Sequence, residues 1–142
     1  MIADFNTMPL TFSDCNIKYF NHSLPTPGFG LINKLHTLAK FEYLVNKGPN
    51  KKRKPLEYKK ILFTDCYDFD EKVFVDIMVH EMIHYYIAWN GIKDNGEHGL
   101  KFMEMANRLN EAYGLNVTRT FDSSSFVKTA NAPKSLFKIL FG

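Results

Sequence analysis

The first clear periodicity in the chain is that of a helix. Apolar side chains recur at intervals of three and four positions, which places them on one helical face: Phe12, Cys15, Tyr19 and Phe20. Pro25 and Pro27 follow shortly afterwards and are incompatible with a continuing helix. The pattern therefore predicts a helix over residues 9–21.

Three segments with strand character come next. Alternation of apolar and polar positions is clearest over residues 38–46 and weaker over residues 29–36, and a third segment over residues 56–64 ends in an apolar run. In the clearest segment, Lys40 and Glu42 point to one side, and the opposite side collects Ala39, Phe41, Tyr43 and Val45. We expect these segments to form a small three-stranded antiparallel sheet with one face buried.

A long helix is predicted after the strands. Asp68 or Asp70 can cap its first turn, the helix runs to about Asn90, and Gly91 is a natural stop. One of its faces carries a continuous stripe, formed by Val73, Ile77, His80, His84 and Ile87. The two histidines of this stripe therefore share a helical face with apolar residues.

A second long helix follows a polar loop. It begins near His98 or Gly99 and closes at Gly114, and its apolar positions again follow helical spacing. Residues 116–121 are expected to form a short strand. The predicted fold class is α+β: a small three-stranded antiparallel sheet with an N-terminal helix and two long helices, which carry the candidate metal site.

Composition is that of an ordinary globular domain. The 142 residues suffice for one domain with its own core, and 45% hydrophobic against 23% charged residues exclude a disordered chain. No apolar run approaches the roughly 20 residues that span a bilayer, and the first residues do not resemble a signal peptide. Cys15 and Cys66 are too few for a four-cysteine zinc site and are expected to be buried free thiols in a reducing cytoplasm.

Positive charge is concentrated in one segment. Residues 47–60 contain seven Lys or Arg against one Glu, and the cluster at its centre is Lys51, Lys52, Arg53 and Lys54. A solvated hairpin loop is the simplest interpretation. The alternative is a nucleic-acid-binding patch, because each phosphate that a cation neutralises releases counterions.

The strongest chemical signal is the run HEMIH at residues 80–84. On a helix, His80 and His84 lie one turn apart on the same face, and their imidazoles can share one zinc ion at about 2.0–2.1 Å. Glu81 stands beside this pair, where its carboxylate can reach a water molecule held at the metal and act as general base. Two imidazoles and a carboxylate against an apolar core cost several kcal/mol unless a partner is present.

A catalytic zinc site usually has three protein ligands, so one more is needed. His98 opens the next helix after a glycine-containing turn and can face back onto the preceding helix. Glu104 lies 20 residues after His84, a spacing that thermolysin-like enzymes use for a glutamate ligand, but it lacks the surrounding signature of that class. We expect His98 to be the third ligand. Tyr113, Arg108 and Arg119 stay open as oxyanion donors, and Asp76, Asn107 or backbone carbonyls as partners of the histidine Nδ1 protons.

These residues resemble the SprT-like domain, the protease domain of the Spartan group. The HExxH helix of that family is followed by a His-Gly-x-x-Phe segment, matched here by His98, Gly99 and Phe102, with Leu100 where the family often has proline. An upstream block matches at Asn16, Tyr19, Phe20, Leu24 and Pro25, and a downstream block at Asn110, Gly114 and Leu115. The resemblance covers roughly residues 15–120.

The resemblance implies a zinc-dependent metallopeptidase that cuts protein or peptide substrates, often proteins associated with DNA. It divides the chain into a SprT-like domain over residues 1–121 and a basic tail over residues 122–142, and two cysteines cannot build the zinc ribbon of many relatives. We expect no membrane partner, and DNA is a candidate partner through the loop at residues 47–60. The rival interpretation is a zinc-stabilised nucleic-acid-binding module without catalytic activity, although such a module has no need of Glu81.

Overall fold

The computed structural model describes residues 1–134. In chain order, its elements are α1 (Thr7–Tyr19), β1 (Gly28–Ile32), β2 (Ala39–Val45), β3 (Leu56–Thr64), β4 (Tyr67–Asp68), α2 (Glu71–Trp89), α3 (Leu100–Tyr113) and β5 (Val127–Lys128). The α+β class and the three predicted helices are confirmed, with ends that differ by one or two residues. Asp70 caps α2 by accepting a hydrogen bond from the Lys72 backbone N–H, and Gly114 closes α3 in the left-handed conformation, at a φ of 69°.

The main sheet is mixed, so the prediction of an antiparallel sheet is wrong. Its strand order is β1-β3-β2: β2 runs antiparallel to β3, whereas β1 runs parallel to β3. Phe29 and Phe41, from β1 and β2, flank Ile61 of β3 on opposite sides. The parallel pairing is feasible because β2 and its hairpin supply the long connection that parallel strands require. This order leaves β2 at an edge of the sheet.

The strand predicted over residues 116–121 is also wrong, because side chains satisfy the backbone there. Asn110 bonds both the N–H and the carbonyl of Val117, at 2.8 and 2.9 Å, and Asp76 accepts from the Asn116 N–H at 3.0 Å. The last short strand is β5, which pairs antiparallel with β4. Residues 135–142, the end of the predicted basic tail, lie outside the described residues, and the division of the chain at residue 121 stays a prediction.

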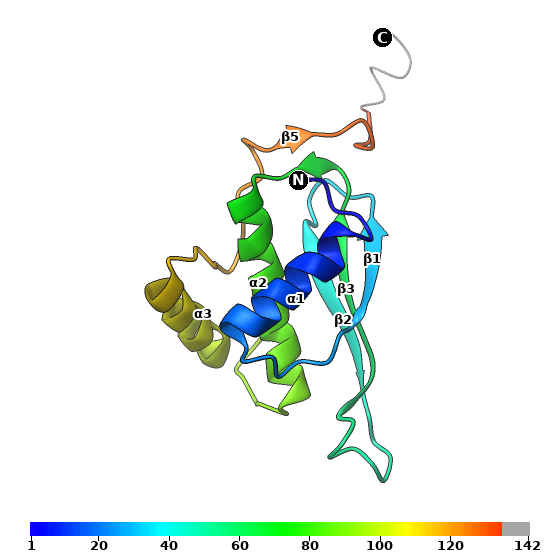
Figure 1. Ribbon diagram of the computed structural model, residues 1–142, viewed down its shortest axis with the longest axis vertical. Coiled ribbons are helices and arrows are strands. Elements are labelled where there is room, and N and C mark those ends of the chain that lie inside the picture. Colours follow the sequence, from blue (N-terminus) through cyan, green and yellow to red (C-terminus); the bar gives the residue numbers. More distant parts are fainter. Residues whose placement is uncertain (135–142) are drawn as a thin grey trace.

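Helix α2 is the centre of the core. Figure 1 shows it between α3 and the sheet, with α1 crossing in front of it, and it contacts α1, α3, β2 and β3. A stack of aromatic rings joins three of these elements: Tyr85 of α2 lies 6.4 Å from Phe12 of α1 and 5.1 Å from Phe41 of β2, between ring centroids. Burial on several sides explains the largely apolar sequence of α2. In residues 1–134, no helix has the length and apolar character required to cross a bilayer.

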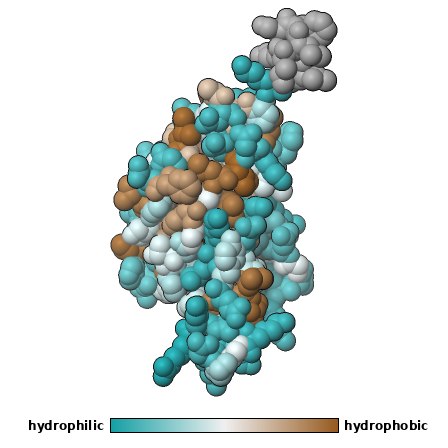
Figure 2. Space-filling view, turned by 90° about the vertical axis from the view of Figure 1, so that its right-hand side faces the viewer, coloured by the Kyte–Doolittle hydropathy of each residue, from teal (hydrophilic) through white to brown (hydrophobic). Residues whose placement is uncertain are grey.

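The β2–β3 hairpin projects from this core (Figure 1). Residues 51–54 lie at its tip and are all exposed, and the molecular surface at this lower end is hydrophilic (Figure 2). Closer to the core, the stem of the hairpin exposes Leu44, Val45 and Tyr58. Ala39, Phe41 and Tyr43 line one cavity beside α2, as their alternation predicted, whereas Val45 follows an irregularity in the register and is exposed. The half of β2 that pairs in regular register is therefore the half that faces α2.

Candidate metal centre

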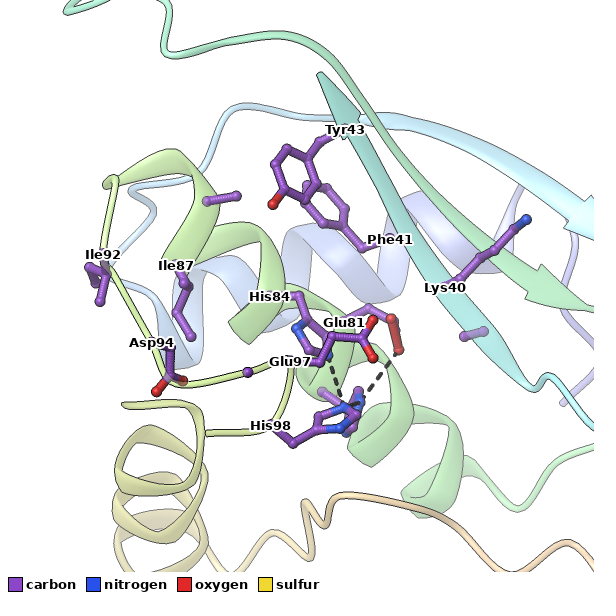
Figure 3. Close-up of a pocket in the computed structure, with 14 residues that line it drawn as sticks. Lys40, Phe41, Tyr43, Glu81, His84, Ile87, Ile92, Asp94, Glu97 and His98 are labelled. Atoms are coloured by element: carbon purple, nitrogen blue, oxygen red, sulfur yellow. Dashed lines mark hydrogen bonds and ion pairs between the residues drawn. The ribbon is translucent and has the colours of Figure 1, made fainter. Parts of the chain in front are cut away.

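Three imidazoles from two elements converge on one point. His80 and His84 come from successive turns of α2, and His98 comes from the loop that precedes α3. The Nε2 atom of His98 lies 3.1 Å from Nε2 of His80 and 3.2 Å from Nε2 of His84, and the three potential ligand atoms all lie within 4.8 Å of one another. Figure 3 shows His84 and His98 pointing toward each other from their separate elements. The structure thus brings together the three histidines that the sequence singled out.

This arrangement fits a tetrahedral metal ion. Nitrogen ligands at 2.0–2.1 Å from a tetrahedral zinc stand ~3.3 Å apart, which is close to the two distances that join Nε2 of His98 to the other histidines. The number of available protons also favours a metal ion. A neutral imidazole has one N–H, so Nε2 of His98 can donate a hydrogen bond to only one of its two neighbours. A cation accepts all three lone pairs at once. Histidine nitrogens suit zinc and several other transition metals, so the donor set alone does not select the metal.

A backbone carbonyl orients His80. Its Nδ1 lies 2.7 Å from the Thr118 carbonyl oxygen, which can only accept, so Nδ1 carries the proton and Nε2 presents a lone pair. The segment around Thr118 is the one that Asn110 and Asp76 hold in place. Asp76, one of the candidates for a direct partner of these histidines, thus acts on the backbone beside His80. Of the partners left open, it is a carbonyl that contacts His80.

The N-terminus of α3 places His98. Asp94 accepts hydrogen bonds from the Lys101 and Phe102 N–H groups at 3.0 and 2.9 Å, and Asn95 accepts from the Leu100 N–H at 2.8 Å. This folds the loop tightly against Gly99, where a Cβ atom would lie 2.4 Å from oxygens of both Asp94 and Asn95. Only glycine therefore fits the position after His98 without rearrangement of the loop.

Phe102 forms the apolar floor of the centre. It is fully buried, and its ring centroid lies 4.9 Å from His80, 4.7 Å from His84 and 4.9 Å from His98. Because His98 and Phe102 are four residues apart, the first turn of α3 brings both to the same side. This contact gives a physical reason for the phenylalanine of the His-Gly-x-x-Phe segment.

Burial strongly perturbs the ionisable groups. Burial, together with the neighbouring imidazoles, lowers the pKa of both His80 and His84 to about 4, so both rings are neutral and available as ligands at pH 7. Glu81 is 6% exposed, and its Oε2 lies 3.9 Å from Nε2 of His80. Burial raises the pKa of Glu81 to about 8, and the charge of Glu97 contributes. A carboxyl group that exchanges its proton near neutral pH thus stands beside the imidazoles.

The histidines lie between two recesses. One is a cavity of about 490 Å³, hereafter the β2 cavity, bounded by the free edge of β2, by α2 around Ile87 and by the loop that carries Glu97 (Figure 3). The other has about 470 Å³ and is lined by His36, Arg119 and Phe121. The sequence pattern singled out neither Glu97 nor His36. The adjacency of Glu97 to His98 was the only available signal, because the position of His36 depends on the fold.

Several sequence candidates lie elsewhere. Glu104, the alternative third ligand, is exposed on α3, stands 4.0 Å from Lys101 and lines a separate groove that also contains Arg108. Tyr113 packs against Tyr19, with ring centroids 4.9 Å apart. Of the three oxyanion candidates, Arg119 alone lines a recess with His80 and Glu81. Residues 51–54 belong to the hairpin tip and line neither recess.

Comparison with known proteins agrees with this geometry. A search among curated proteins found no matching sequence. The model of the SprT-like family matches residues 10–121, well over half of the chain. The matched stretch includes the main sheet, α2, α3 and the three convergent histidines. The chain therefore belongs to the SprT-like family.

Proposed function

We propose that this protein is a zinc-dependent metallopeptidase in which His80, His84 and His98 hold one zinc ion and Glu81 is the general base. The observation that carries the proposal is the convergence of three imidazole nitrogens beside a buried carboxylate at the wall of an open cavity. Membership of the SprT-like family supports the same class of activity. A site with three ligands leaves a coordination position free, which a structural site does not need.

The bound ion would supply two effects, a lower pKa for the attacking water and a polarised scissile carbonyl. Glu81 takes the proton of that water and later transfers it to the leaving amine. Burial raises its pKa to about 8 in the metal-free protein, and a bound cation would lower this pKa toward the neutral range in which a general base works best. Arg119 borders the same site and is the candidate donor to the developing oxyanion.

The sheet edge supports a peptide as the substrate. Within the part of the chain that the structure describes, β2 pairs with β3 alone, and Ala39, Phe41 and Tyr43 line the cavity that holds the histidines. An extended segment can pair with such an edge through main-chain hydrogen bonds, which leaves its side chains to reach the cavity. We therefore propose unfolded or extended protein segments as substrates.

Cleavage of casein by zinc-loaded protein tests the proposal. We expect cleavage that a chelator abolishes and zinc restores, and we expect Glu81→Gln to bind zinc but lose activity by at least about 100-fold. Glu104→Gln is the matched control, because it removes a carboxylate outside the site. Full activity of Glu81→Gln would refute the role of this residue, and no cleavage of any substrate would refute the enzyme.

The exposed cations at residues 51–54 favour a second element of the proposal, an association with DNA. In this form, the hairpin holds nucleic acid and the metal centre cuts proteins associated with it. Free buried thiols at Cys15 and Cys66 agree with the proposed cytoplasmic location. If the zinc-loaded protein binds DNA but cleaves neither casein nor histones, with or without DNA, the alternative of a zinc-stabilised binding module is the better description.

A further inference from the structure

The β2 cavity has an apolar wall and an acidic mouth. Phe41 and Tyr43 of β2 face Ile87 of α2 and Ile92 of the following loop across it. Its volume of about 490 Å³ accommodates a long side chain with part of a backbone. Because lysine and arginine bury their methylene stems on apolar surface and keep their charge at a polar rim, this lining matches a long cationic side chain.

Most of the charged side chains around the cavity already contact another group. Lys40 is directed away from the histidines in Figure 3 and stands 3.4 Å from Glu42. Asp94 already accepts backbone hydrogen bonds as the cap of α3. Glu81 is buried beside His80. These three charges are therefore engaged with other groups.

Glu97 is different. It is exposed at the mouth, its side chain extends toward Glu81 in Figure 3, and it lines both recesses that flank the histidines. Within residues 1–134, no hydrogen bond or ion pair involves its carboxylate. Glu97 is not among the residues whose ligand atoms cluster at the metal centre, so its charge is free for an incoming group.

We propose that Glu97 is a specificity-determining residue that selects substrates with a lysine or arginine side chain next to the scissile bond. This proposal rests on the peptidase function proposed above. The cationic head pairs with the Glu97 carboxylate at the mouth, and the stem lies along Ile87 and Ile92. The same carboxylate disfavours an acidic side chain by like-charge repulsion.

A peptide series tests the proposal. We would use fluorogenic peptides of alanine and glycine with one central lysine, norleucine or glutamate, and locate the cut by mass spectrometry. For the wild type, we expect kcat/KM for the lysine peptide to exceed that for the norleucine peptide by about tenfold, the effect of one charge-assisted hydrogen bond. Glu97→Gln should bring the ratio close to one, Glu97→Lys should reverse it in favour of glutamate, and the control Glu104→Gln should leave it unchanged.

A binding measurement separates this proposal from the peptidase function. Fluorescence anisotropy of labelled lysine and norleucine peptides on zinc-loaded Glu81→Gln, with and without Glu97→Gln, needs no turnover. If Glu97→Gln selectively removes binding of the lysine peptide, this supports the role of Glu97 even if the wild type cuts no peptide. In that case only the peptidase function fails. Equal binding and cleavage of the lysine and norleucine peptides by protein with intact Glu97 would overturn the proposal. The proposal would also be overturned if Glu97→Gln lost zinc and bound every peptide more weakly by the same factor, because Glu97 would then act through the metal.

Discussion

Glu81→Gln should stabilise the metal-free protein in a manner that depends on pH. Burial raises the pKa of Glu81 from 4.5 to about 8 in the folded protein. Between these two values the folded chain keeps a proton that the unfolded chain has lost, so the free energy of unfolding falls as pH rises. The contribution of Glu81 is fully favourable below pH 4.5 and is lost by about pH 8. Glutamine has nearly the same shape as glutamate and carries no charge, so the variant does not lose this stability as pH rises.

The magnitude follows from the linkage relation. Between pH 5 and pH 8, a carboxyl group whose pKa rises from 4.5 to about 8 loses ~3 kcal/mol of folding stability. His80 and His84 act in the opposite direction: burial lowers the pKa of both to about 4, so each destabilises the fold as pH falls below 6.5. These histidine contributions are common to wild type and variant, and the difference between the two proteins isolates Glu81.

Urea unfolding of both proteins, followed by the fluorescence of the single tryptophan, Trp89, measures the difference. We expect the stability advantage of Glu81→Gln to grow by ~3 kcal/mol from pH 5 to pH 8 in the presence of a chelator. Zinc should reduce the advantage, because a cation beside the carboxylate favours its charged form. Parallel stability curves for the two metal-free proteins across this range would refute the buried, perturbed carboxyl group.

Three further perturbations test the remaining features. His98→Ala should weaken zinc binding by more than about 100-fold in competition with a chromogenic chelator, whereas His22→Ala, in the turn after α1, should not. Asp94→Ala should lower the midpoint of urea unfolding, because it removes the cap of α3; an unchanged midpoint would contradict the capping role. Replacement of residues 51–54 by alanine should weaken DNA binding and reduce its salt dependence in a titration, with casein cleavage in the absence of DNA unchanged; equal DNA affinity would exclude the hairpin.

Helical elements were the most predictable part of the fold. The apolar stripe of α2 and the glycine after α3 are local features, and the structure places both helices within one or two residues of their predicted ends. The partners of strands were less predictable. Alternation along residues 38–46 identified the buried face, but it carries no information about which strand lies alongside, and β3 came to lie between β1 and β2.

The strand predicted over residues 116–121 shows the same limit. Its residues suit a strand, yet Asn110 and Asp76 satisfy the backbone of Asn116 and Val117, and this anchors the Thr118 carbonyl beside His80. Strand preference depends on the tertiary context, and here side chains distant in sequence replaced a strand partner. The wrong prediction falls on a segment that supports the candidate metal centre.

The sequence alone determined which helix carries the imidazoles and the neighbouring carboxylate, because the helical repeat converts a spacing of four residues into a shared face. It also pointed to His98 as the third imidazole, which the structure brings to the other two. Tertiary structure alone decided that the edge of β2, Glu97 and Arg119 border this centre. The physical reason is that a hydrophobic pattern states which face of an element is buried, whereas the packing of the whole chain selects what that face meets.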